Sequence, residues 1–135
     1  MKLITILFLI ISFSFNAKAD VINDVVVNNN DRISLNTIKT YGDIKIGNDY
    51  TSDDLNNILK DLYKTNFFKD VSLKVENNIL VIDVIENKLI QKININGIKS
   101  SKMTEAILEN LILKSKSPFI ESQVEIELLR IKSSL

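Results

Sequence analysis

The chain has no cysteine, no histidine and no tryptophan among its 135 residues, and it has one proline and three glycines. The absence of histidine and cysteine removes the commonest general base, the thiol nucleophile and the soft metal ligands. The glycines stand alone and form no phosphate-binding loop. Asp53 and Asp54 are adjacent acids, but they lie where a helix is predicted to begin, and acids in a first turn favour the helix dipole. We therefore predict that the protein is not an enzyme, binds no metal or cofactor and has no small-molecule substrate.

The chain also has no excess of positive or negative charge. Lys and Arg number 17, as do Asp and Glu, and no short segment is strongly basic. Nucleic-acid binding depends on clustered basic side chains, so nucleic acid is excluded as a partner. Without cysteine there is no disulfide, and stability must come from burial of the apolar residues, which make up 45% of the chain.

The first 19 residues have the features of a signal peptide. Lys2 supplies a short positive segment, and Leu3 to Phe15 is an almost unbroken apolar run. Ala17-Lys18-Ala19 gives the small-x-small pattern of a signal peptidase site, so cleavage is predicted before Asp20. An uncleaved membrane anchor is the alternative, although the apolar run is shorter than the roughly 20 residues that span a bilayer. No cysteine lies near the site, which excludes a lipid-anchored lipoprotein.

The remaining chain contains an internal repeat. Two segments match two others about 68 residues later, and the matched pairs are Ile22–Asn29 with Ile90–Gly97 and Tyr50–Leu62 with Phe119–Ile131. A fixed spacing of this size is typical of tandem modules, each one a supersecondary unit stacked on its neighbour. We therefore predict a first module at 20–87 and a second at 88–135.

Two helices are predicted in the first module. Ser34 is placed to cap a short helix and Gly42 to end it. Thr51 and Asp54 resemble a capping box at the start of a longer helix, which has one apolar face. Asn66 is a candidate for a left-handed residue at the end of that helix.

A β-hairpin is predicted after the longer helix. Val71–Glu76 alternates apolar and polar residues, Asn77-Asn78 gives a two-residue turn, and Ile79–Ile85 forms the returning strand. Pairing Glu76 with Ile79 brings three apolar pairs onto one face, and these are Val71 with Val84, Leu73 with Ile82 and Val75 with Leu80. The returning strand is apolar on both faces, so we expect it in the middle of the sheet.

The predicted fold class is α+β, with two helices on a three-stranded mixed sheet in the order β-α-α-β-β. Val21–Val27 supplies the first strand of this module. The second module offers a strand at Ile90–Asn96, a helix around Met103–Leu113 and another helix from Ser122 onward, but no terminal hairpin. We predict that this truncated second module is poorly packed or mobile in isolation.

Two segments resemble the polypeptide-transport-associated (POTRA) domain family. Leu62–Val71 is similar to the family's L-Y-x-T-G-x-F-x-D-V signature, and Val84–Gly97 is similar to its V-x-E-x-P-x-I junction and the I-x-x-x-G opening of the next module. Asn66 replaces the usual glycine, and asparagine accepts the left-handed conformation at modest cost. Lys88 replaces the usual proline, so we expect a less fixed angle between modules. The resemblance covers about 20–135.

Four side chains near the signature have structural interpretations. One of Phe67 and Phe68 is expected to fill the gap between helix and sheet. Tyr63 is expected on the apolar face of the helix with its hydroxyl at the rim. Asp70 is interpreted as a solvated residue at the start of a strand.

The resemblance implies a chaperone-like periplasmic scaffold of the outer-membrane β-barrel assembly machinery, held at the outer membrane by a C-terminal barrel that this chain lacks. Its partners would be unfolded outer-membrane proteins and accessory assembly proteins. A sheet with an open edge accepts an extended segment as an added strand. We hypothesise that the partner-binding edge consists of Val71, Ser72, Leu73, Lys74, Val75 and Glu76, and that proline at Ser72 or Lys74 blocks it.

Three alternatives stay open. The chain could be the POTRA region of a transporter that secretes one partner protein, or of a cell-division protein anchored by its N-terminal segment. It could also be a periplasmic structural module without a client.

Overall fold

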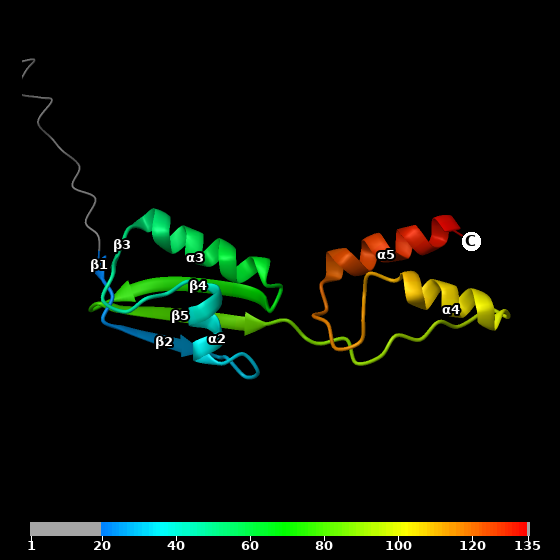
Figure 1. Ribbon diagram of the computed structural model, residues 1–135, viewed down its shortest axis with the longest axis horizontal. Coiled ribbons are helices and arrows are strands. Elements are labelled where there is room, and N and C mark those ends of the chain that lie inside the picture. The colour runs from blue at the N-terminus through cyan, green and yellow to red at the C-terminus, as the bar shows by residue number, and fades with distance from the viewer. Residues whose placement is uncertain (1–19, 135) are drawn as a thin grey trace, which may run out of the picture.

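The computed structural model describes residues 20–134, which form two units joined by an extended segment (Figure 1). The predicted cleavage residues Ala17 and Ala19 lie outside the described residues, and Asp20 is the first residue inside them. The first unit consists of β1 (Asp20–Val21), β2 (Asp24–Asn28), α2 (Leu35–Tyr41), β3 (Asp49–Tyr50), α3 (Ser52–Lys64), β4 (Phe68–Glu76) and β5 (Ile79–Glu86). The second contains α4 (Ser101–Asn110) and α5 (Glu121–Ser134). The α+β class is confirmed.

The main sheet of the first unit has three strands in the order β2-β5-β4. β2 runs parallel to β5, and β4 runs antiparallel to it, so the sheet is mixed as predicted. β5 lies in the middle, as its apolar character on both faces indicated. β4 and β2 are therefore the two edges of this sheet.

The predicted strand Val21–Val27 is wrong as a single element, because the structure divides it into β1 and β2. Ile22 lies between the two and is fully buried. Its N–H donates to the Asn48 carbonyl at 3.0 Å, and its carbonyl accepts the Gly47 N–H at 2.7 Å. β1 pairs with β3 in a separate two-stranded sheet. The break arises because a loop distant in sequence takes the backbone bonds of Ile22.

The hairpin has the predicted turn and register. Asn77 and Asn78 both have left-handed backbone, with φ of 51° and 64°, which is the geometry of the two-residue turn that matches strand twist. Glu76 is paired with Ile79, and the three apolar pairs expected on the inner face are present. A β-bulge between Phe68 and Asp70 interrupts the ladder near the start of β4.

The helix caps follow local rules, with one exception at Gly42. Ser34 caps α2, Thr51 and Asp54 form a capping box on α3, and Asn66 is left-handed with φ of 59°. Gly42 ends α2 as expected, but its φ is −82°, so it does not need left-handed freedom. A Cβ at Gly42 would instead lie 3.1 Å from the side chain of Ile44, so a close approach explains this glycine.

The core of the first unit lies between the helices and one face of the sheet (Figure 1). Phe68 is buried and fills the gap at the helix–sheet junction, whereas Phe67 is partly buried and packs edge-on against Tyr41. The buried apolar side chains of this unit are Ile22, Val25, Ile38, Ile44, Tyr50, Ile58, Leu62, Phe68, Val71, Leu80, Ile82 and Val84.

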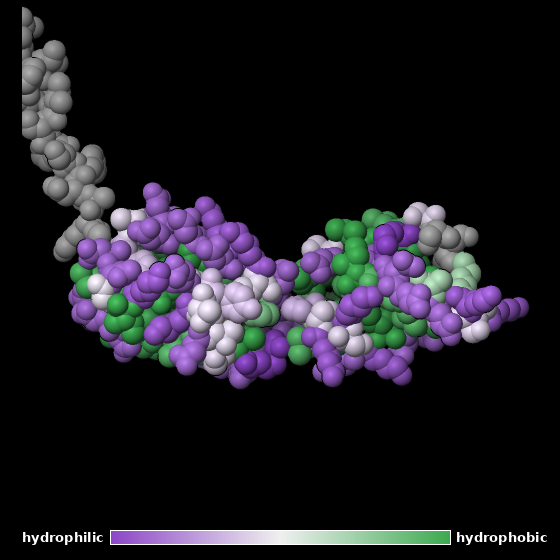
Figure 2. All heavy atoms as spheres, in the orientation of Figure 1, coloured by the Kyte–Doolittle hydropathy of each residue, from purple (hydrophilic) through white to green (hydrophobic). Residues whose placement is uncertain are grey.

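The second unit is much less buried. The predicted strand Ile90–Asn96 is wrong, since no residue in that range is in a strand, and the pairing next to it is an isolated bridge between Leu89 and Pro118. A strand needs a neighbouring strand for its backbone groups, and none lies beside this segment within residues 20–134. In that same range, the buried apolar side chains of the second unit are Ile90 and Leu111 alone. Figure 2 shows apolar surface among its helices, and its large exposed apolar residues are Met103, Leu108, Ile112, Phe119, Ile126, Leu128 and Leu129.

Glu127 is the most deeply buried charged residue among the side chains with described burial. The repeat places it where the first unit has Ile58, a core residue. Arg130 forms an ion pair with one carboxylate oxygen of Glu127, while the other oxygen, Oε2, has no hydrogen-bond partner. The second unit thus has a charge at a position that the first unit fills with an apolar side chain.

Candidate functional site: the open edge of the first sheet

The candidate site is the outer side of β4. Nothing in the described part of the chain pairs with this side, because β4 has β5 as its only neighbour in the sheet. All six residues of the predicted edge, from Val71 to Glu76, lie within β4. The structure therefore places them together at a sheet edge, and their role in partner binding stays a prediction.

The hairpin turn decides which backbone groups of β4 face outward. Glu76 and Ile79 flank a two-residue turn, so their N–H and C=O groups bond to each other. Alternate residues of an antiparallel strand point the same way, which turns Lys74 and Ser72 toward β5 as well. Val71, Leu73 and Val75 consequently direct their N–H and C=O groups away from the sheet.

A hydrogen bond of Val71 supports this assignment of outward-facing backbone groups. Its N–H donates to the hydroxyl of Tyr63, at 3.1 Å, rather than to β5. The expectation that proline at Ser72 or Lys74 would block the edge is therefore wrong. The N–H groups of those two residues face β5, so proline there would break the ladder inside the sheet. Leu73 and Val75 are the positions at which proline removes an outward N–H.

Tyr63 closes one end of the edge. Its hydroxyl donates to Oδ1 of Asp70 at 2.8 Å while it accepts the Val71 N–H, and it lies 3.5 Å from the Val71 carbonyl oxygen. The Val71 N–H lowers the pKa of Tyr63, but the Asp70 carboxylate and burial raise it by more, so the pKa lies above its ordinary value of 10.0. Tyr63 has the predicted place at the rim. Asp70 is exposed as expected, and it also orients the Tyr63 hydroxyl.

The two faces of the edge differ in polarity. Leu73 and Val75 point to the helix side and are half-buried, because no further strand covers them. Ser72, Lys74 and Glu76 are exposed on the opposite face, where Lys74 and Glu76 form an ion pair at 3.1 Å. A strand added here would meet apolar groups on one side and polar groups on the other.

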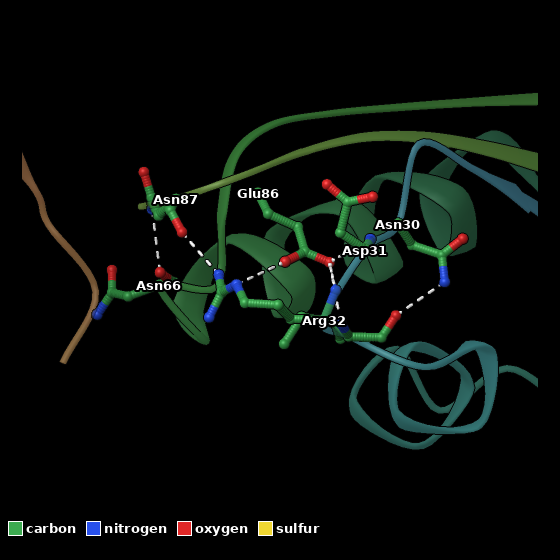
Figure 3. Close-up of polar contacts among 7 residues, drawn as sticks. Asn30, Asp31, Arg32, Asn66, Glu86 and Asn87 are labelled. Atoms are coloured by element: carbon green, nitrogen blue, oxygen red, sulfur yellow. Dashed lines mark hydrogen bonds and ion pairs between the residues drawn. The ribbon is translucent and has the colours of Figure 1, made fainter. Parts of the chain in front are cut away.

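A second feature, which the sequence reasoning missed, is a carboxylate clamp at the end of β5 (Figure 3). Oε1 of Glu86 accepts the N–H groups of Asp31, Arg32 and Ile33, each at 2.9 Å. Oε2 lies 3.1 Å from Nε of Arg32, although the angle is not that of a hydrogen bond. The Glu86 side chain is 8% exposed. The only sign of this clamp in the sequence is Glu86 itself, as the glutamate of the segment similar to V-x-E-x-P-x-I.

The clamp also holds the start of the connection between the units. Arg32 donates to the Asn87 carbonyl at 2.7 Å, and the Asn87 side chain donates to the Asn66 carbonyl at 3.0 Å (Figure 3). The next residue is already bonded to the second unit, since the Phe119 N–H donates to the Lys88 carbonyl at 2.7 Å. The backbone therefore passes from one unit to the other between Asn87 and Lys88.

The described residues form neither a metal-binding group nor a membrane-spanning helix. No group of three or more acidic side chains within residues 20–134 is arranged to hold a metal ion. The helices in that range are all too short or too polar to cross a membrane.

The chain is similar to two curated proteins named outer membrane protein assembly factor BamA. One, from Neisseria meningitidis serogroup B, is 34% identical over 90 residues, which is 67% of this chain and 11% of that protein. The other, from Neorickettsia risticii, is 28% identical over 110 residues, which is 82% of this chain and 14% of that protein. The chain thus spans about one-eighth of the length of these relatives.

Solved structures share the fold. The N-terminal domain of Omp85 from Thermosynechococcus elongatus matches with a TM-score of 0.58 and 13% identity, over 85% of this chain and 50% of that chain. POTRA1-2 of the periplasmic domain of Omp85 from Anabaena matches with a TM-score of 0.53 and 12% identity, over 86% of this chain and 78% of that chain. No protein-family model matches. The fold is that of POTRA domains.

Proposed function

We propose that this chain, which is similar to the N-terminal part of the outer-membrane protein assembly factor BamA and has the POTRA fold, is a periplasmic scaffold module of outer-membrane β-barrel assembly. It receives unfolded outer-membrane proteins and accessory assembly proteins by adding one of their segments as a strand to β4. The open edge of β4, with outward backbone groups at Leu73 and Val75, is the observation that carries this proposal.

Strand addition suits a scaffold that has many clients. Main-chain hydrogen bonds hardly depend on the client's sequence, whereas pockets for alternate side chains give preference. Strands of membrane barrels alternate apolar and polar residues. The edge of β4 has the same alternation, with Leu73 and Val75 on the helix side and Lys74 on the other.

The predicted leader supports export to the periplasm. The names of the two curated relatives support a role in outer-membrane assembly rather than in the secretion of one partner or in cell division. The mature chain then acts by binding, and residues 20–87 supply the binding edge.

Photocrosslinking tests the proposal. A benzophenone amino acid at Lys74, in the mature chain, reports capture of a urea-unfolded outer-membrane barrel protein diluted from denaturant. Leu73→Pro removes an outward N–H, and edge strands tolerate proline at such positions. Leu73→Ala is the matched control because it loses the same side chain but keeps the N–H. Losing one hydrogen bond predicts a crosslink yield about five- to tenfold lower for Leu73→Pro than for Leu73→Ala. Equal yields from the two variants, both folded by circular dichroism, would contradict strand addition.

A further inference from the structure

The backbone groups of β4 that face outward are not equally available. Val71, Leu73 and Val75 share this orientation, but the Tyr63 hydroxyl already holds the Val71 N–H and lies close to its carbonyl oxygen. At the other end of β4, the turn at Asn77 follows directly after Glu76. The free part of the edge therefore consists of Leu73 and Val75.

Local structure fixes the Tyr63 ring in this place. Tyr63 lies in the last turn of α3, and left-handed Asn66 reverses the chain so that β4 starts beside that turn. The β-bulge between Phe68 and Asp70 displaces the start of β4 from regular pairing. The Tyr63 hydroxyl donates a hydrogen bond to Asp70, with 2.8 Å between the oxygens, and its own oxygen is then free to accept the Val71 N–H.

We propose that Tyr63 is a specificity-determining residue that limits strand addition to a short window at Leu73 and Val75. This inference rests on the proposed function of the edge. The ring also stands in the path of any strand that would continue past Leu73 toward Val71. The segment that fits is a short extended one, with apolar side chains beside Leu73 and Val75 and a polar side chain beside Lys74.

The window accounts for two features of the site. The hydroxyl accepts the Val71 N–H when no partner is bound, so two rather than three outward N–H groups of Val71–Glu76 are left exposed. A short window also gives few hydrogen bonds, which predicts weak binding and rapid release of each client segment. Rapid release suits a scaffold that passes its clients onward.

Peptide length provides the test. Two acetylated peptides are compared, Val-Lys-Val-Glu and its tandem duplication. Within each peptide the number of Lys equals the number of Glu, so the two have the same net charge and charge does not favour the longer one. Binding is followed by NMR titration of the mature chain and by amide exchange at Val71, Leu73 and Val75. In the unsubstituted protein, Val71 is protected without peptide and the other two amides become protected on binding. Doubling the peptide length gives no gain in affinity beyond the about twofold that two equivalent copies of the segment provide.

Tyr63→Ala removes the hydroxyl and the ring and opens one more residue of the edge. We expect its Val71 amide to exchange rapidly alone, to become protected by the longer peptide, and to give about a tenfold gain in affinity on doubling the length. Tyr63→Phe loses the hydroxyl that accepts the Val71 N–H, so its Val71 amide also exchanges rapidly. It keeps the ring, which still prevents the gain in affinity. If Tyr63→Ala does not fold, rapid exchange of Val71 in Tyr63→Phe, with no gain from length beyond about twofold, still supports the inference.

Two contrary results have different meanings. If Leu73 and Val75 gain no protection from either peptide in the unsubstituted protein, strand addition at this edge is wrong. If they gain protection but the longer peptide already binds the unsubstituted protein more tightly than this about twofold statistical gain, only the role of Tyr63 is wrong. The same holds if the longer peptide gains no more than that in folded Tyr63→Ala.

Discussion

Removal of the Glu86 side chain is expected to destabilise the first unit more than removal of any other charged side chain that reaches its surface. One oxygen of Glu86 accepts three successive backbone N–H groups, and the carboxylate is 8% exposed. Glu86→Ala leaves those donors without their shared acceptor. A buried backbone N–H that loses its acceptor typically costs about 1–3 kcal/mol, and a partner charge left buried adds to that cost. We expect about 3–4 kcal/mol in total for the three donors, because the Arg32 side chain is 40% exposed and its charge adds little to the cost.

Two further variants separate charge from geometry. Glu86→Gln keeps an acceptor oxygen but no charge, and we expect a loss of about 1.5 kcal/mol. Arg32→Ala is expected to cost about 1 kcal/mol, because the Arg32 side chain is 40% exposed and its Nε does not make a well-aligned hydrogen bond to Glu86. Glu76→Ala is the control, since that side chain is 58% exposed and its loss should stay within about 0.5 kcal/mol.

Urea unfolding followed by far-ultraviolet circular dichroism measures these free energies. The slope of the transition must stay constant among the variants for the comparison to hold. A loss below about 1 kcal/mol for Glu86→Ala would refute the reasoning, because it would mean that the three N–H groups find equivalent partners in water.

Three other predictions concern positions with separate physical causes. Gly42→Ala should destabilise the first unit by about 1–3 kcal/mol in the same urea assay, because the added Cβ would lie 3.2 Å from Ile58 and crowd the core; a neutral result would mean that the helices shift freely. The side-chain and backbone hydrogen bonds from Thr51 hold the pKa of Asp54 below its ordinary value of 3.8. The capping box should therefore stabilise α3 fully above pH 3.8 and lose this effect as the pH falls through the lowered pKa. Asp54→Asn should remove this contribution from the acid-unfolding curve. Glu127→Ile, which introduces the residue found at the matching Ile58, should stabilise the second unit by about 1–2 kcal/mol, seen as slower amide exchange in α5; unchanged or faster exchange would contradict this.

Local rules predicted those parts of the fold that depend on neighbours in sequence. The asparagine turn fixed the hairpin register, and the Thr51–Asp54 pair fixed the start of α3. The same rules failed where the partner of a segment decides its structure. Val21–Val27 divides because a distant loop bonds to Ile22, and Ile90–Asn96 stays irregular because no strand lies beside it in residues 20–134.

The candidate site was predictable as an edge but not in its details. Alternation along Val71–Glu76 indicated a half-buried strand, and the order of the sheet then placed it outside β5. The blocking of Val71 by Tyr63 depends on a β-bulge and on the turn after α3, neither of which alternation reveals. The Glu86 clamp joins residues that are far apart in sequence, so hydrophobic periodicity carried no sign of it.

Amide hydrogen exchange at Leu73 and Val75 is the most direct measurement of the central claim. The mature chain is compared alone and with an excess of a urea-unfolded outer-membrane barrel protein, diluted from denaturant. Strand addition predicts that these two amides exchange rapidly in the free chain and become protected in the complex, while Ser72 and Lys74, bonded to β5, are slow in both. Capture of the client with Leu73 and Val75 still exchanging rapidly would contradict the account.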